Sequence, residues 1–579
     1  MPNDTTTKNI YINSKGVTQN TFDAIVIGSG ISGGWAAKEL CDHKLRTLVL
    51  ERGRDVRHIK DYPTTNLDPW QMPHRGKLTT TLAKENPIAD RCYAFDENTQ
   101  HFFVKDKEHP YIQEKPFDWI RGYQVGGKSL IWARQTQRWS RFEFENPARD
   151  GYANWPIGYN DIAPWYSHVE KFVGISGNKD GMETLPDGEF LAPWEMNCPE
   201  KHIQKSINEH FKDRRVIQGR CAHLTSPKQI HLDQGRGQCQ ARNICYRGCP
   251  FGGYFSSNSS TLPWAEKTGY LTMRPHSVVH SIIYDEQKGK AIGVRVIDSN
   301  TKGTTDYFAK IIFVNAACIN SNLLLLNSTS NRFPNGFGND NGLLGKYIAF
   351  HDYRANITAT IDGFADKAEY GRRPTAVMIP NFRNVYKQDT DFLGGYMTHY
   401  SASPIGWQRG FGMEGIGEAF KNQLAEQADE WSIYMMIQGE TIPKEKNHVR
   451  LSKDQKDDWG IPLLITSVEY DENDNKKMKD FFEQGKAMLE KAGCKNITTV
   501  DNGRVPGNDI HEMGGVRMGK DPKTSLLNEW NQFHNCKNVF VTDGACMTST
   551  GNQNPSITFM ALTARAVDHA VEELKKGNL

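Results

Sequence analysis

The segment from Phe22 to Gly53 constrains the fold of this chain more than any other, and its sequence is FDAIVIGSGISGGWAAKELCDHKLRTLVLERG. An apolar strand, a glycine-rich turn, a segment of helical period and a second apolar strand follow one another, as in a βαβ unit. Gly28 permits the tight turn, Gly30 lets the backbone approach a pyrophosphate, and Gly33 lets helix and strand pack closely. The sequence therefore predicts a Rossmann-like domain that binds a dinucleotide at the helix N-terminus.

The end of the second strand adds two candidate ligands of the dinucleotide. Glu51 closes the strand, where an acidic side chain can bind ribose hydroxyls, and Arg52 follows it. The strand ends in LERG, which resembles FAD-binding proteins more than NAD-binding ones. The βαβ unit alone leaves both cofactors open.

Composition limits the classes of partner. The chain has 579 residues, enough for two or three domains, and its 38% apolar and 24% charged residues predict a soluble globular protein. Its formal charge is +2, so we expect neither nucleic acid nor an anionic membrane as partner. No apolar run approaches the roughly 18 residues that span a bilayer, so direct membrane insertion is not expected. The N-terminal residues contain no export signal, which predicts a cytoplasmic protein by default, or a periplasmic one if a partner subunit carries it through export.

Residues 121–139, RGYQVGGKSLIWARQTQRW, resemble the first signature of the glucose-methanol-choline (GMC) flavoprotein oxidoreductases. In that family a double glycine, here Gly126 and Gly127, lets the chain pass close to the flavin. Ser129 and Val279 are assigned to the same cofactor site. Four further blocks resemble the family in its order, at residues 316–328, 342–352, 511–519 and 541–566.

The resemblance implies FAD as the cofactor and an α/β fold, in which a Rossmann-like FAD-binding domain carries a second, substrate domain built on an antiparallel sheet. Asp543 resembles the residue that approaches the ribityl and pyrophosphate end of the flavin. Some members bind FAD covalently through a histidine near the first signature, but GGKSLIW contains none, so non-covalent FAD is expected. We expect the FAD-binding domain at 18–155, 221–350 and 501–579, and the substrate domain at 156–220 and 351–500.

His511 and Asn554 match the catalytic pair of the family. Histidine suits the base that removes the hydroxyl proton of an alcohol, because its unperturbed pKa of about 6.5 lies near working pH; flavin N5 would take the hydride. The alternatives are a core histidine satisfied by the backbone, and for Asn554 a helix N-cap, a position that asparagine favours. For His351 a structural and a functional role remain equally open.

Cys239, Cys245 and Cys249 lie together in the loop 237–253, GQCQARNICYRGCPFGG. Free or disulfide-bonded thiols, a zinc site and an iron–sulfur cluster are the three hypotheses. Zinc usually takes four ligands in paired C-x-x-C elements, which are missing here, although Cys221 is a possible fourth ligand. A cysteine followed by proline is typical of the last ligand in a ferredoxin run.

The loop also resembles the cysteine box of bacterial FAD-dependent glucose dehydrogenases, GMC members that bind a three-iron, four-sulfur cluster and pass electrons to a cytochrome. The resemblance implies a dehydrogenase of the glucose, gluconate or glucoside 3-dehydrogenase type. Its partners would be a carbohydrate substrate, a small accessory subunit, and a cytochrome or other one-electron acceptor. The alternatives are a GMC oxidase that reduces O2, a non-redox hydroxynitrile lyase and a non-catalytic flavoprotein.

Overall fold

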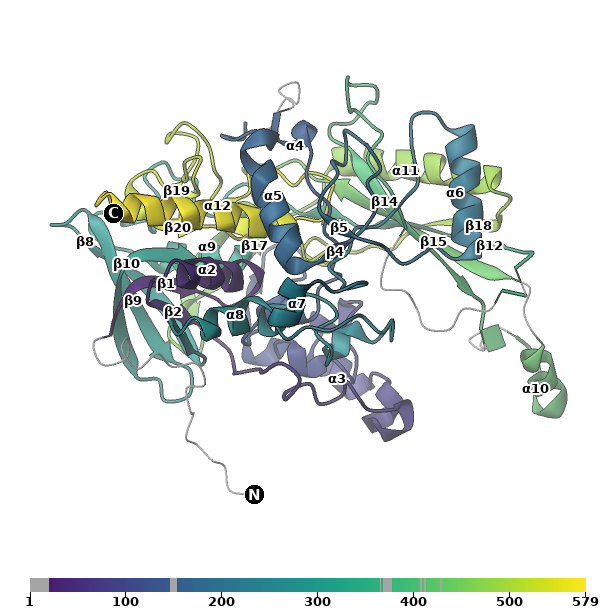
Figure 1. The fold of residues 1–579 in the computed structure, drawn as a ribbon, viewed down its shortest axis with the longest axis horizontal. Coiled ribbons are helices and arrows are strands. Elements are labelled where there is room, and N and C mark those ends of the chain that lie inside the picture. The colour runs from purple at the N-terminus through teal and green to yellow at the C-terminus, as the bar shows by residue number, and fades with distance from the viewer. Residues whose placement is uncertain are drawn as a thin grey trace.

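Two large β-sheets organise the computed structural model of the protein, and they lie side by side along its long axis (Figure 1). The structure describes residues 20–145, 154–364, 366–367, 377–406, 409–410, 413–426 and 430–579. No helix in these ranges combines the length and the apolar content needed to cross a bilayer.

The first sheet has a parallel core, as the βαβ pattern predicts. Its strands, in spatial order, are β20 (Cys536–Val541), β10 (Thr304–Val314), β1 (Thr21–Ile27), β2 (Thr47–Leu50) and β7 (Leu271–Arg274), all paired in parallel. The antiparallel strands β19 (Gln532–Phe533), β9 (Lys290–Asp298) and β8 (Ser277–Asp285) extend it. All four residues of β2 are buried, because both faces of a parallel sheet are covered.

The C-terminal helix returns to the N-terminal nucleotide-binding unit. Helix α12 (Ser556–Lys575) begins after Pro555, as predicted, and packs against α2 (Ile31–Asp42) and α5 (Tyr159–Val173). Figure 1 shows this yellow helix beside the purple α2. The return places segments more than 500 residues apart in sequence around one end of the parallel sheet.

The second sheet is antiparallel and confirms the predicted fold class. Its order is β18 (Lys495–Asp501), β12 (Ala355–Ile361), β15 (Trp431–Glu440), β14 (Tyr396–Pro404), β13 (Val377–Ile379) and β6 (Ile217–Gln218), and β11 (His351–Asp352) also pairs with β15. Helices α11 (Glu472–Lys491) and α6 (Cys198–His210) pack against it. Apolar side chains such as Ile357, Ile433 and Phe481 fill the layer between them.

Smaller elements connect and cover the two sheets. The strands are β3 (Ile112–Gln113), β16 (His448–Lys456) and β17 (Pro462–Ser467) in one sheet, with β4 (Ile175–Ser176) and β5 (Phe190–Leu191) in another. The remaining α-helices in the described ranges are α3 (Thr80–Glu85), α4 (Arg141–Glu145), α7 (Gln229–Asp233), α8 (Thr261–Lys267), α9 (Cys318–Asn327) and α10 (Gly417–Ala425).

Candidate functional site

One cavity at the carboxyl ends of the parallel strands collects most of the predicted site residues. Its lining includes Gly28, Gly30, Glu51, Arg52, Gly127, Ser129, Val279, His511, Asp543 and Asn554. Gly33 and Gly126 are not part of the lining. A crevice at this end of an open parallel sheet is where α/β folds bind their ligands.

The three glycines of the first turn have different surroundings. Gly28 has a φ of +96°, which favours glycine, and it turns the chain from β1 into α2. A β-carbon on Gly33 would lie 1.9 Å from the carbonyl oxygen of Gly28, so this glycine allows the helix to pack against the turn. A β-carbon on Gly30 would meet nothing within 4 Å. Gly30 therefore leaves its side of the cavity open to a ligand.

The two glycines of the first GMC signature have different surroundings. Gly127 lines the cavity, as expected of a residue close to a flavin. Gly126 instead faces protein, since a β-carbon there would lie 1.5 Å from Oδ1 of Asn258. The amide of Gly126 donates to Oγ of Ser29 at 3.0 Å, and Oγ of Ser129 donates to the carbonyl of Gly126 at 2.5 Å. The first bond joins the signature turn to the first glycine turn, and the second closes the signature turn on itself.

Two buried carboxyl groups hold the walls of the cavity. Glu51 accepts hydrogen bonds from Oγ of Ser29 at 2.6 Å and from the amide of Gly53 at 2.9 Å. Asp543 accepts from Oγ of Ser321 at 2.5 Å and from the amide of Ala545 at 2.9 Å. Burial raises the pKa of Glu51 and raises the pKa of Asp543 to about 6. Both carboxylates therefore lock loops together at the cavity.

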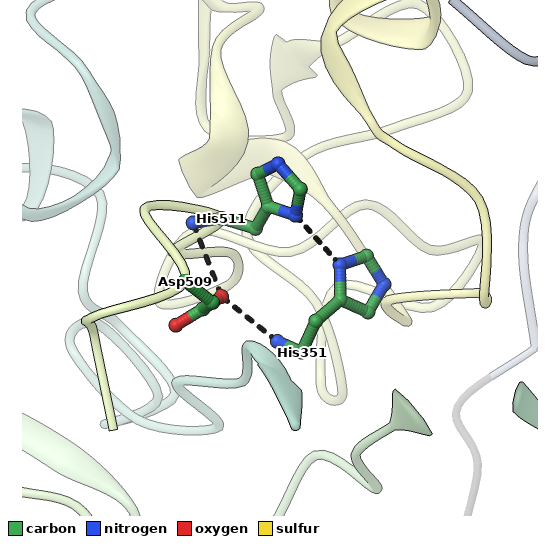
Figure 2. A group of neighbouring side chains, drawn as sticks. All are labelled: His351, Asp509 and His511. Carbon is green, nitrogen blue, oxygen red and sulfur yellow. Dashed lines mark hydrogen bonds between the residues drawn. The ribbon is translucent and has the colours of Figure 1, made fainter. Parts of the chain in front are cut away.

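His511 and His351 face each other at the other end of the site (Figure 2). Nδ1 of His351 lies 2.8 Å from Nδ1 of His511, and the rings meet edge to face. One carboxylate oxygen of Asp509 accepts from the backbone amides of both histidines, at 2.9 Å from His351 and 3.1 Å from His511. Asp509 thus fixes the relative position of two segments that lie 160 residues apart.

The hydrogen-bond partners assign the tautomer of each ring. Nε2 of His351 lies 3.0 Å from the carbonyl oxygen of Gly551 and 3.2 Å from that of Thr550. Carbonyls only accept, so this nitrogen carries the proton and Nδ1 of neutral His351 is an acceptor. His511 must then donate from Nδ1. Nε2 of His511 is left as the unprotonated nitrogen, which is the state required of a base.

Burial keeps both rings neutral. It lowers the pKa of His351 to about 4. The pKa of His511 is lowered well below its usual value, first by burial and then because a protonated ring would be repelled by His351, Lys128 and His399. His511 therefore remains ready to accept a proton throughout the neutral pH range.

Asn554 is not a helix cap. Helix α12 has Pro555 at its N-cap position, without a side-chain cap. The side chain of Asn554 hydrogen-bonds Tyr353, whose hydroxyl donates to Oε1 of Gln438. Nε2 of His399 lies 3.0 Å from the same oxygen. The antiparallel sheet and the segment before β12 thus supply a polar wall beside the candidate catalytic pair, His511 and Asn554.

Several buried oxygens of the cavity have no hydrogen-bond partner within the described ranges. They are Oδ1 of Asn315, Oδ1 of Asp509, Oε1 of Glu512 and Oδ1 of Asn554, all of residues that line the cavity. Unpaired buried oxygens are unfavourable unless a ligand or water pairs with them. Together with the open side of Gly30, they fit a large polar ligand such as a dinucleotide.

The three loop cysteines lie outside this cavity and have free thiols. Cys239 is buried, and Cys245 and Cys249 are half-buried. A β-carbon on Gly253 would lie 2.9 Å from Cα of Cys239, and the amide of Gly253 donates to Sγ of Cys249 at 3.4 Å. The thiols also act on one another electrostatically, so the fold brings all three into one neighbourhood.

At least two of the three sulfurs lie farther apart than the ligands of one zinc ion. Within the described part of the chain, three metal-ligating side chains have their atoms within 4.8 Å of one another only at His351, Asp509 and His511. Cys221, the possible fourth ligand, forms backbone bridges with Gln135 and Ser176.

Two residues connect the cysteine loop to its surroundings. His223, two positions beyond Cys221, has Nε2 4.0 Å from Sγ of Cys245. The guanidinium of Arg134 lies 4.6 Å from the ring centre of Tyr246, the residue after Cys245, and Arg134 also lines the cavity. Arg134 therefore spans the two sites.

The family models of GMC oxidoreductase match residues 22–351 and 443–563. The chain belongs to the GMC oxidoreductase family. The family is FAD-binding, and its members act on CH–OH groups. The match covers the first glycine turn, the signature turn and both catalytic candidates.

Relatives of known activity align over nearly the whole chain. The chain is 27% identical to 2-methyl-1,2-propanediol dehydrogenase of Mycolicibacterium austroafricanum, with 94% of each chain covered. It is 25% identical to the fructose dehydrogenase large subunit of Gluconobacter japonicus, covering 96% of this chain and 98% of the relative. Pyridoxine 4-oxidase from Mesorbium loti has the same fold, with a TM-score of 0.59 at 15% identity, and the match covers 95% of this chain and 99% of that one. Dehydrogenases and oxidases thus both occur among the similar proteins.

Five side chains near the two sites were not singled out from the sequence: Arg134, His223, Tyr353, Asp509 and Gln438. Arg134 lies inside the first GMC signature, and Asp509 lies two residues before His511. Their closeness to these motifs could have marked both as candidate site residues. Tyr353 lies between β11 and β12, and Gln438 lies in β15, so strand pairing in the antiparallel sheet brings both to the site. Neither residue has a recognisable motif beside it in the sequence.

Proposed function

We propose that the protein oxidises a hydroxyl group of a sugar or glycoside to a carbonyl, as a dehydrogenase of the glucoside 3-dehydrogenase or glucose/gluconate dehydrogenase type. The observation that carries this proposal is the tautomer of His511, whose Nε2 is unprotonated in a cavity suited to a dinucleotide. The activity of the relative from Gluconobacter japonicus, a fructose dehydrogenase, supports a carbohydrate substrate.

The residues of the cavity fit FAD. Gly30 leaves space for a diphosphate at the start of α2, and Glu51 lies at the end of β2, where ribose hydroxyls bind. When bound, the flavin supplies the acceptor for the hydride of the substrate. The histidines that line the cavity in the described ranges are His280 and His511, and neither belongs to the first signature. We infer that FAD is held without a covalent bond.

The chain's own side chains handle the proton. Nε2 of His511 takes the hydroxyl proton, while the Nδ1 proton of His511 stays on its hydrogen bond to His351. The unpaired Oδ1 of buried Asn554 is placed to accept a hydrogen bond from the substrate. The polar wall of Tyr353 and Gln438 orients Asn554.

We further propose that electrons leave through an iron–sulfur cluster on Cys239, Cys245 and Cys249, to an accessory cytochrome or another one-electron acceptor. A cluster places several irons between its cysteines, so it suits sulfurs that are too far apart for one zinc ion. Arg134 and Tyr246 span the space between the flavin cavity and the loop. Electron transfer from the flavin through such a cluster to a one-electron acceptor favours a dehydrogenase over an oxidase.

The decisive experiment mixes the anaerobic purified protein with a panel of sugars, sugar acids and glycosides while flavin absorbance is recorded. Bleaching by one of them supports the proposal, and bleaching by non-sugar alcohols alone contradicts the substrate class. Rapid reoxidation by O2, with no one-electron acceptor needed, identifies an oxidase. Turnover of a cyanohydrin without bleaching identifies a lyase.

The cluster has its own test. Anaerobically purified protein is expected to contain iron and acid-labile sulfide and to give an electron paramagnetic resonance signal when oxidised. Cys245→Ser is expected to abolish that signal and cytochrome reduction but to leave flavin bleaching intact. Protein that contains zinc, or no metal, contradicts the cluster and leaves the flavin chemistry standing.

A further inference from the structure

Two buried arginines beside the cysteine loop have no carboxylate partner among the residues that the structure describes. Arg134 is 6% exposed and Arg236 is 1% exposed. Among the described residues, the groups that raise the pKa of Arg134 most are Cys245 and three tyrosines, and for Arg236 the group is Cys249. No aspartate or glutamate forms an ion pair with either in the described ranges. A buried cation without a counter-charge is unfavourable.

Four other buried arginines of the described residues form ion pairs with carboxylates, namely Arg121, Arg138, Arg214 and Arg220, whereas buried Arg517 and Arg565 donate to backbone carbonyls. The guanidinium of Arg220 lies 3.1 Å from a carboxylate oxygen of Asp187. The guanidinium of Arg138 lies 2.6 Å from a carboxylate oxygen of Glu170. At the cysteine loop, the thiol of Cys245 acts electrostatically on Arg134 and the thiol of Cys249 acts on Arg236, so each arginine lies beside a group that becomes negative when it ligates a metal.

Arg236 is held against the second half of the loop. Its Nε donates to the carbonyl of Gly252 at 3.0 Å, and its Nη1 donates to the carbonyl of Val173 at 2.7 Å. Nη1 also lies 3.2 Å from Oε1 of Gln234. Nη2 is buried and has no partner among the described residues. One edge of this guanidinium is thus available to a group that the structure does not contain.

Arg134 lies against the middle of the loop, at the residue that follows Cys245. Its guanidinium lies over the rings of Tyr246, at 4.6 Å, and Tyr254, at 5.6 Å, and its Nη1 donates to the carbonyl of Trp132 at 2.6 Å. Its Nε is buried and unpartnered within the described part of the chain. The backbone of Arg134 has a φ of +64°, a conformation that non-glycine residues rarely adopt. The two rings and the carbonyl of Trp132 therefore fix the position of this guanidinium.

We propose that Arg134 and Arg236 supply the positive charge that balances an anionic iron–sulfur group on Cys239, Cys245 and Cys249, and thereby raise its reduction potential. This inference rests on the cluster of the proposed function. The cysteines ligate as thiolates, and each electron that the group accepts adds a further negative charge. Buried positive charges stabilise the reduced state more than the oxidised state, and low exposure reduces screening.

The test is a redox titration of the cluster signal in Arg236→Gln and Arg134→Gln, with Arg236→Lys and Arg134→Lys as charge-retaining controls. Each glutamine variant is expected to weaken reduction of the cluster by at least tenfold, or about 59 mV for one electron. The lysine variants are expected to stay closer to the parent potential. An unchanged potential in both cluster-containing glutamine variants overturns the proposal.

Gln234→Glu tests the same idea while retaining Arg236. Oε1 of Gln234 already accepts from Arg236 and from Oγ of Ser260, at 2.5 Å, so glutamate preserves the shape and this acceptor but loses the hydrogen bond that Nε2 of Gln234 donates to the carbonyl of Phe172 at 2.9 Å. The new carboxylate gives Arg236 an acidic partner and is expected to lower the cluster potential. This variant decides the question if Arg236→Gln does not fold, and an unchanged potential in it contradicts a role for Arg236.

Two readouts separate this inference from the proposed function. Iron and sulfide in the parent protein test the cluster, and their absence overturns both statements. Iron with an unchanged potential in the variants overturns this one alone. Flavin bleaching by sugar in Arg236→Gln and Gln234→Glu is expected to match the parent, since neither residue lines the flavin cavity.

Discussion

Nδ1 of His351 lies 2.8 Å from Nδ1 of His511, so the two rings share one proton across this contact. The carbonyls of Thr550 and Gly551 keep the other proton on Nε2 of His351. His351, which the sequence left undecided, therefore determines the tautomer of the candidate base. It acts as a positioning residue through His511, and four predictions follow from this arrangement and its scaffold.

His511→Ala is expected to bind FAD but to lose substrate-driven flavin reduction by about two or more orders of magnitude, the scale of general base catalysis. Anaerobic stopped-flow absorbance measures the rate, and the flavin content of the purified variant is the control. A variant that bleaches at the parent rate would exclude His511 as the base.

Two replacements of His351 test whether its Nδ1 acceptor matters. His351→Asn keeps an acceptor near the position of Nδ1, whereas His351→Leu removes it and leaves the Nδ1 proton of His511 unpaired. We expect flavin reduction to be at least about tenfold slower in the leucine variant than in the asparagine variant, from the loss of one buried hydrogen bond. Equal rates at all pH values would show that His351 only fills space.

The pH profile of flavin reduction follows from the lowered pKa of His511. A base is active in its unprotonated form, so the rate is lost only when pH falls through its pKa. Since that pKa lies well below 6.5, the rate is expected to persist below pH 6.5. Burial raises the pKa of Asp509 to about 7, so an inflection near neutral pH would come from this residue and should disappear in Asp509→Asn. A midpoint at or above 6.5 that persists in Asp509→Asn argues against the lowered pKa.

Two alanine replacements distinguish packing from ligand approach in the first turn. A β-carbon at Gly33 would lie 1.9 Å from the carbonyl oxygen of Gly28, so Gly33→Ala is expected to destabilise the protein even without cofactor. Gly30→Ala has open space there, so it should fold normally and lose FAD affinity, by about tenfold or more, because the methyl group displaces the diphosphate. Thermal unfolding of both apoproteins, with FAD titration, is the measurement. Equal apoprotein stability of the two variants would contradict this assignment.

Local sequence determined the βαβ unit, the glycine turn and the last helix. The reason is that each depends on neighbours within about 30 residues: apolar periodicity, the glycine spacing and the proline before α12. The separate antiparallel sheet was also predictable in outline, because β12 and β15 contain alternating apolar residues. The family resemblance then named His511 and Asn554 by position.

Tertiary structure alone decided what surrounds those residues. The pairing of His351 with His511, the wall of Tyr353 and Gln438, and the unpaired arginines beside the cysteines join segments that are far apart in the chain. Such contacts depend on the registers of long-range strands and on which charges are buried together, and neither leaves a local sequence pattern. The sequence by itself therefore determined which residues can do the chemistry. The fold determined their protonation states, their partners and the charge around them.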